Sequence, residues 1–114
     1  MIRGRIVLVL FPFDDLSSAK VRPAVCLTEP VGLHRHVILA FITSRVPDDL
    51  LDSDIVLESD SYDFAMTGLR MTSTLRLHRM ITLSTSLIRR DLGKLPPRVE
   101  REVASKLKKM FGLM

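Results

Sequence analysis

The chain has 114 residues, of which 46% are hydrophobic and 26% are charged, and its formal net charge is +4. This length suits a single domain with one core over residues 1–114, and the composition excludes a disordered chain. No apolar run is long enough to cross a bilayer, and a single cysteine excludes an internal disulfide. We therefore expect a cytoplasmic protein that does not span a membrane.

The charge is distributed unevenly along the chain. Residues 46–69 contain seven acidic residues and no lysine or arginine, which leaves 17 basic against six acidic residues elsewhere. That remainder, with a net charge of +11, favours a polyanionic partner such as nucleic acid or an acidic protein tail. Lysine and arginine also serve as solvated surface, so the charge by itself does not identify the partner.

The first half of the chain predicts three strands. Residues 4–13 (GRIVLVLFPF) are apolar on both faces, which is typical of a strand inside a sheet, and the aspartates after Pro12 argue against a signal peptide. A polar loop follows. The next strands are predicted at residues 22–29 (RPAVCLTE) and 36–44 (HVILAFITS), with a turn between them.

The second half predicts further strands and one helix. A short strand is expected at 54–58 (DIVLE), an alternating strand or bent pair at 71–84, and either a strand or a helical turn at 86–95. Residues 96–114 predict a helix, with prolines in its first turn, lysines near its end and Gly112 as its C-cap. Its apolar face consists of Val99, Val103, Leu107 and Met110.

These elements predict a mainly β protein of the α+β class. We expect about five to seven strands in a small barrel or strongly twisted sheet, closed by the C-terminal helix.

Arg22 interrupts an otherwise apolar strand. Pro23 disfavours the α conformation for the residue before it, so Arg22 is held extended and its side chain points to one face of the sheet. The guanidinium either pairs with a carboxylate such as Asp14 or Asp15, or it is available to bind an anion.

Thr43 and Ser44 end the third predicted strand. The alternation places Thr43 on one face with Leu39 and Phe41. Its hydroxyl either ends the strand through a local hydrogen bond or is held at the edge of a cleft.

A third polar group falls on the predicted strand at 71–84. The alternation directs Leu75 and Leu77 toward the core and leaves Thr74, Arg76 and His78 together on the other face. A hydroxyl, a guanidinium and an imidazole in one row form an anion-binding or proton-transfer surface, or else a solvated sheet face.

Other kinds of site are not supported. His34 and His36 lack the further ligands that a metal site needs, so we expect neither a metal nor another cofactor. With no Trp and one Tyr, base stacking is excluded as the main mode of binding. Cys26, between Val25 and Leu27, predicts a buried thiol rather than a nucleophile.

In their order, the segments GRIVLVLFPF, KVRPAVCLTE, HVILAFITS, TSTLRLHRMITL and LGKL, followed by the amphipathic helix, resemble the MazF/PemK toxins of toxin–antitoxin modules. The resemblance covers nearly the whole chain, and VRPAV together with FITS is its most specific part. It implies a small SH3-like, CcdB-type β-barrel with a C-terminal helix, and a homodimer. It also implies a metal-independent endoribonuclease, an mRNA interferase, that cuts single-stranded RNA at short sequences.

The resemblance also implies roles for particular residues. The catalytic arginine of the family falls on Arg22, its catalytic threonine on Thr43, and a further strand arginine on Arg76. Some members carry an acid where this chain has His78, so the general acid or base is not assigned. The residues expected to bind RNA are Ser44, Thr74, Arg76, His78, Asp14 and Lys20.

The expected reaction is attack of the RNA 2′-hydroxyl on the adjacent phosphate, which gives a 2′,3′-cyclic phosphate. The expected protein partner is an antitoxin whose disordered acidic tail covers the basic groove. Two alternatives are a non-enzymatic, CcdB-like toxin that binds gyrase through the C-terminal KKMFGLM segment, and a catalytically silent barrel that binds nucleic acid. The amphipathic pattern of the helix predicts that the apolar residues of KKMFGLM pack inward.

Overall fold

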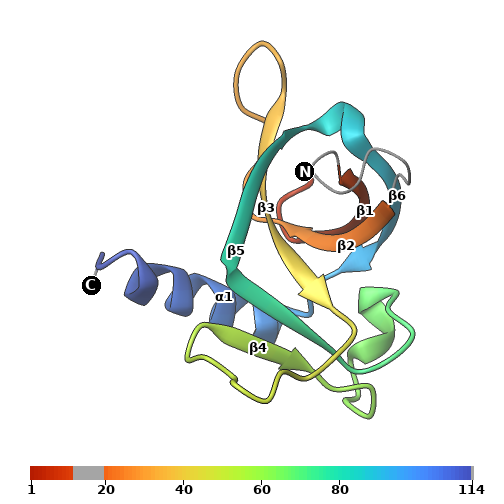
Figure 1. Ribbon diagram of the computed structural model, residues 1–114, viewed down its shortest axis with the longest axis vertical. Helices are drawn as coiled ribbons and strands as arrows, with labels where there is room; N and C mark the ends of the chain where they lie inside the picture. The colour runs from red at the N-terminus through yellow and green to blue at the C-terminus, as the bar shows by residue number, and fades with distance from the viewer. Residues whose placement is uncertain (12–19, 114) are drawn as a thin grey trace.

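One curved antiparallel sheet, with a helix packed against it, makes up the fold of this computed structural model, which describes residues 1–11 and 20–113 (Figure 1). The strands are β1 (Arg5–Phe11), β2 (Lys20–Cys26), β3 (His36–Thr43), β4 (Asp54–Leu57), β5 (Ser73–Ser84) and β6 (Ile88–Lys94). Two 3₁₀ turns, η1 (Phe64–Thr67) and η2 (Thr85–Leu87), and the helix α1 (Pro97–Met110) complete it. In these ranges, no helix has the length and apolar character needed to cross a membrane.

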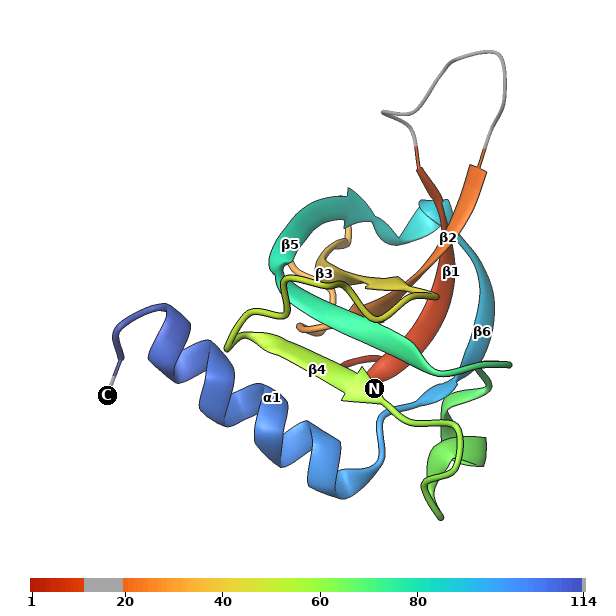
Figure 2. The same ribbon diagram turned by 60° about the horizontal axis from the view of Figure 1, so that its bottom comes forward.

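The strand order is β4-β5-β3-β2-β1-β6, so β4 and β6 form the two edges of the sheet. Figure 2 shows α1 lying beside β4, the strand at one edge of the sheet. The predicted class, mainly β with a C-terminal helix, is confirmed. The term barrel applies only loosely, because β4 and β6 do not pair with each other and the sheet stays open.

The ambiguous segments take definite forms in the structure. Residues 71–84 hold the single strand β5, which bends where its register against β3 shifts between Ala40 and Phe41. The segment 86–95 contains the end of η2 and then β6, and the short strand expected in the acidic segment is β4.

The core lies on both faces of the sheet, as the two-sided apolar pattern of the first strand predicts. Along β1, Ile6 packs in the cluster that includes α1, while Val7 and Val9 pack in a second cluster on the opposite face. Leu75 and Leu77 are fully buried, which confirms their predicted direction.

The helix α1 is buried at its first turns and exposed at its end. Val99 and Val103 are buried and Leu107 packs partly against the same cluster, but Met110 is 37% exposed. The expectation that the apolar residues of KKMFGLM pack inward is therefore wrong. The end of the helix runs past the sheet (Figure 1), and Met110, Phe111 and Leu113 are exposed in the part of the chain that the structure describes. Gly112 follows the helix with a φ of +67°, and its N–H bonds to a carbonyl of the last turn, as expected for a glycine that caps a helix.

The edge strand β6 packs against η1 through backbone contacts at glycines. A Cβ on Gly93 would lie 2.2 Å from the carbonyl oxygen of Met66 and 2.7 Å from the carbonyl carbon of Thr67. A Cβ on Gly68 would lie 2.0 Å from the carbonyl oxygen of Leu92. Only glycine permits this approach, which holds the segment between β4 and β5 against the other edge of the sheet.

We predict that Gly93→Ala lowers the free energy of unfolding by about 2–3 kcal/mol, because the new methyl group must displace the backbone of η1. The matched control is Gly32→Ala, since Gly32 has a φ of +77° but no heavy atom within 4 Å of an added Cβ. That control should cost about 1 kcal/mol from backbone strain alone. Urea unfolding of both variants measures the difference, and equal losses would contradict the packing argument.

Candidate anion-binding cleft

A cleft opens where β2 and β3 stop pairing. The two strands pair only over Ala24–Cys26. Leu27 donates its N–H to the carbonyl oxygen of Ile38 in β3. The N–H groups of every second residue in a strand point to the same side, so the nitrogen of Pro23 also faces β3, but it carries no hydrogen to donate. The strands separate at that point. Two residues beyond the pair formed by Ala24 and Phe41, Arg22 on β2 lies level with Thr43 on β3.

The cleft has a volume of about 560 Å³ and is strongly basic. Thr43 and Ser44 line it, and its described lining contains no acidic residue. Four arginines line it from three segments of the chain: Arg22, Arg45, Arg76 and Arg79. Such a concentration of guanidinium groups, with hydroxyl groups beside them, is suited to an anion such as a phosphodiester.

Two aromatic rings support Arg22. Its Cζ atom lies 5.6 Å from the centroid of the Phe11 ring, within the range of a cation–π contact. Phe11 in turn packs edge-to-face on Phe41, with 4.9 Å between the ring centroids. The exposed guanidinium of Arg22 is thus held against the Phe11 ring of β1, which packs on Phe41 of β3; these two strands flank β2 on either side.

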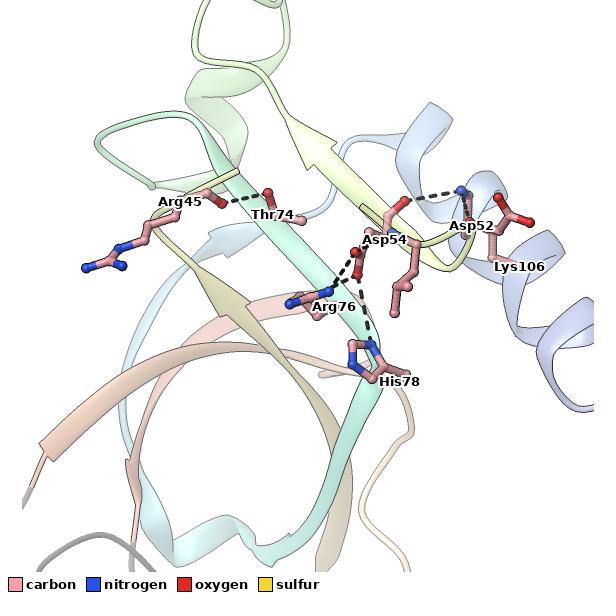
Figure 3. Close-up of polar contacts among 8 residues, drawn as sticks. Arg45, Asp52, Asp54, Thr74, Arg76, His78 and Lys106 are labelled. Atoms are coloured by element: carbon pink, nitrogen blue, oxygen red, sulfur yellow. Dashed lines mark hydrogen bonds and ion pairs between the residues drawn. The ribbon is translucent and has the colours of Figure 1, made fainter. Parts of the chain in front are cut away.

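Arg76 is held from behind by Asp54. The register places Phe41, Arg76 and Asp54 side by side across β3, β5 and β4, on one face of the sheet. The Nε and Nη2 atoms of Arg76 donate to the two carboxylate oxygens of Asp54, each at 3.1 Å (Figure 3). The Asp54 side chain has no exposed surface, while that of Arg76 is 17% exposed.

The ionisation of this pair follows from its surroundings. Burial by itself raises the pKa of Asp54, but the hydrogen bonds from the Arg76 side chain and the Leu51 N–H outweigh burial, so the net pKa is lowered. The hydrogen bond to Asp54 raises the pKa of Arg76 further above its usual range. Arg76 therefore acts as a permanent cation and not as a proton donor or acceptor.

Thr74 and His78 do not line the cleft, although alternation puts them in a row with Arg76. Thr74 is fully buried and donates its hydroxyl hydrogen to the carbonyl oxygen of Arg45 at 2.7 Å, so it supports the cleft wall (Figure 3). The Nδ1 atom of His78 lies 4.0 Å from a carboxylate oxygen of Asp54. Leu77–Arg79 have no partners on β3, and this bulge turns Arg79, rather than His78, into the cleft.

Of the remaining residues predicted to bind RNA, one lines the cleft, one does not, and one is not described by the structure. Ser44 lines the cleft, whereas Lys20 lies exposed at the start of β2 and is not among the lining residues. Asp14, as well as Asp15, lies outside the described residues. Sequence reasoning missed Arg45, Arg79 and Asp54; the first directly follows the ITS segment, which is the one local signal that could have indicated it.

Cys26 is buried, as predicted. Burial, followed by the nearby charges of Asp91 and Glu29, raises the pKa of its thiol to about 11, so it is a poor nucleophile. Cys26 is also among the residues that line a second cavity, of about 470 Å³, between the N-terminal segment and α1, whose lining is largely apolar. Across residues 1–11 and 20–113, no cluster of three or more His, Cys, Asp or Glu residues could hold a metal ion.

Comparisons with known proteins identify the family of this chain. Residues 2–111 match the family described as "PemK-like, MazF-like toxin of type II toxin-antitoxin system". The chain belongs to this family. The resemblance noted in the sequence is thereby confirmed, although no curated protein sequence matches this PemK/MazF-family chain.

Solved structures share the fold. The Mycobacterium tuberculosis toxin MazF-mt6 is 22% identical with a TM-score of 0.71, over 95% of this chain and 96% of that chain. MazF from Deinococcus radiodurans is 21% identical with a TM-score of 0.71, over 98% and 96%. An endoribonuclease from a mycobacterial species, solved in complex with its cognate antitoxin, is 13% identical with a TM-score of 0.72, over 100% and 97%.

We predict that acid destabilises the protein partly through Asp54. The pKa of Asp54 in the folded protein lies below its value in the unfolded chain, about 3.9. The ionised carboxylate therefore contributes stability above that pH, and the contribution is lost as the pH falls through the folded-state value. Denaturant unfolding between about pH 3 and pH 6 should show a smaller loss for Asp54→Asn than for the wild type. An equal loss in both proteins would contradict this assignment.

Proposed function

We propose that this protein is a metal-independent endoribonuclease that cuts single-stranded RNA at short, specific sequences. The observation that carries the proposal is that Arg22 and Thr43 line one accessible cleft together with three more arginines. Its family is known for endoribonuclease toxins, which supports this activity over simple RNA binding.

RNA supplies its own nucleophile for this reaction. The 2′-oxygen forms a bond to phosphorus while the bond from phosphorus to the 5′-oxygen breaks. The 2′-hydroxyl loses its proton and the departing 5′-oxygen gains one, so the products carry a 2′,3′-cyclic phosphate and a 5′-hydroxyl. The displacement at phosphorus and the two proton transfers do not require a metal ion, provided that the protein stabilises the extra negative charge on the phosphorane.

Arg22 and Thr43 are the catalytic residues in this proposal. The extended backbone before Pro23 and the ring of Phe11 hold the Arg22 guanidinium in place, so its planar donors meet the phosphoryl oxygens with little rearrangement. Thr43 holds the scissile phosphate by a hydrogen bond. A threonine hydroxyl is too weak an acid or base to transfer the protons alone.

The RNA strand on either side of the scissile phosphate is bound by the other basic and hydroxyl groups of the cleft. Ser44, Arg45 and Arg79 contribute hydrogen bonds and positive charge from its rim. The polar segment after Arg45, residues 46–52, presents donors and acceptors to unstacked bases and contributes to the choice of sequence.

We also propose an antitoxin partner and a homodimer. One structural neighbour was solved with its cognate antitoxin, and membership of a toxin–antitoxin family supports an antitoxin partner for this chain. A disordered acidic tail is complementary in charge to the four arginines of the cleft and would exclude RNA by occupying it.

One observation favours a second candidate function, a CcdB-like toxin that binds gyrase. Met110, Phe111 and Leu113 are 37%, 59% and 71% exposed, so the C-terminal segment offers apolar side chains to a partner. This function does not need the arginine cleft. Inhibition of gyrase supercoiling without RNA cleavage would favour it over the ribonuclease.

We predict that the purified protein cleaves a long single-stranded RNA equally well with and without EDTA. Arg22→Ala should lower the rate by about 100- to 1000-fold, the usual effect of removing one group that stabilises a developing oxyanion. Thr43→Ala should also lower it. Gel analysis of the RNA and mass spectrometry of the product ends provide the measurements.

The matched control is Arg101→Ala, which removes an exposed arginine from α1, outside the cleft, and should keep wild-type activity. Circular dichroism confirms that each variant is folded. Sensitivity to EDTA, or products with a 3′-hydroxyl and a 5′-phosphate, would refute the proposed chemistry. Undiminished cleavage by Arg22→Ala would refute the proposed site.

A further inference from the structure

Arg76 is fixed by the protein before any ligand binds. Its Nε and Nη2 atoms donate to Asp54, which uses one edge of the planar guanidinium. A guanidinium carries five N–H donors, so three remain after these two bonds. Figure 3 shows the other terminal nitrogen of Arg76 pointing away from Asp54. Since Arg76 lines the cleft, this outer edge is what it can present to a bound anion.

Asp54 is itself immobilised from several directions. Its Oδ2 atom accepts a hydrogen bond from the Leu51 N–H at 2.9 Å, and its carbonyl oxygen accepts one from Lys106 Nζ at 3.2 Å. Lys106 also donates to the carbonyl oxygen of Asp52, which ties the start of β4 to α1 (Figure 3). With no exposed surface, the carboxylate of Asp54 cannot contact RNA. Its effect on a ligand must pass through the residues that it contacts.

A gain in folding stability is a weak explanation for the ion pair between Arg76 and Asp54. Removing two charges from water costs free energy, so a buried ion pair is often no more stabilising than packed apolar side chains. What the pair does provide is a fixed direction for the guanidinium, since a carboxylate and a guanidinium meet in one plane. The backbone of Arg45 is also fixed, because Thr74 donates a hydrogen bond to its carbonyl oxygen.

We propose that Asp54 is a positioning residue of the RNA site, which aims the outer edge of Arg76 at a second phosphate, next to the one held by Arg22 and Thr43. Arg45 completes this subsite from the rim. The proposal rests on the proposed function, because the ligand is a phosphodiester of the same RNA strand. The subsite binds substrate and leaves the chemical step to the first phosphate.

The chain offers a matched control in a second ion pair of the same geometry. Arg98 donates from Nε and Nη2 to the two oxygens of Asp63, at 2.8 and 3.0 Å, and the Asp63 side chain is 7% exposed. This pair joins the residue before η1 to α1, and neither partner lines the cleft. Asp63→Asn therefore removes a comparable pair without touching the proposed subsite.

The experiment measures binding of a short 2′-O-methyl RNA of mixed sequence, which has no free nucleophile, at several salt concentrations. Asp54→Asn should bind about tenfold more weakly than the wild type, because Arg76 loses its fixed direction. The slope of log affinity against log salt should fall by about 0.7, the value for one lost phosphate contact to a single strand. Asp63→Asn should match the wild type in affinity and slope.

Steady-state cleavage of unmodified RNA provides a second readout. Asp54→Asn should raise KM by about tenfold and leave kcat within about twofold, since the lost contact binds substrate in the ground state and the transition state alike. A fall in kcat with an unchanged KM would overturn the proposal, as would equal binding by Asp54→Asn and the wild type.

Arg76→Lys keeps the proposal testable where Asp54→Asn does not fold. Lysine retains a positive charge beside the buried carboxylate but lacks the planar fork, so it cannot face Asp54 and a phosphate at once. This variant should also lose affinity and salt slope, and wild-type values for both would overturn the proposal. Wild-type protein that binds the methylated RNA but cleaves no RNA would refute the proposed nuclease and not the subsite. Absence of binding by the wild type would refute the subsite itself.

Discussion

Pro23 has no N–H to donate toward β3, and the ladder between β2 and β3 starts only at the following residue. Hydrogen bonding would otherwise hold the two strands about 5 Å apart and leave no room for a ligand between them. Because the strands separate there, a side chain from each becomes accessible at the same place: Arg22 from β2 and Thr43 from β3. The cleft is thus a consequence of where backbone pairing fails.

The other wall of the cleft depends on β5, which pairs with β3 on one side and β4 on the other. Directly opposite residues in a ladder share a face, so Arg76 meets Phe41 across one ladder and Asp54 across the other. The acidic segment therefore has a structural use beyond its negative charge. Asp54 and Asp63 each hold an arginine in a bidentate pair, one behind the cleft and one at the start of α1.

Bringing four guanidinium groups around one cavity is unfavourable in the absence of an anion, since like charges repel. The structure limits this cost in two ways. Asp54 neutralises Arg76 from the buried side, and Phe11 offers the face of its ring to Arg22. Two of the four cations, Arg76 and Arg22, are thus held in place before an anion binds.

Local sequence patterns determined much of the secondary structure and of the burial of individual side chains. Alternation predicted the burial of Leu75 and Leu77, proline and glycine marked the ends of α1, and the neighbours of Cys26 predicted a buried thiol; the family resemblance identified the toxin fold. The tertiary structure decided what alternation cannot describe. Asp54 reaches Arg76 across 22 positions of sequence, and such a pairing depends on the register of the whole sheet. The bulge in β5 breaks the period of two, so Arg79 enters the cleft and His78 does not, because a single irregular step reverses the direction of every later side chain.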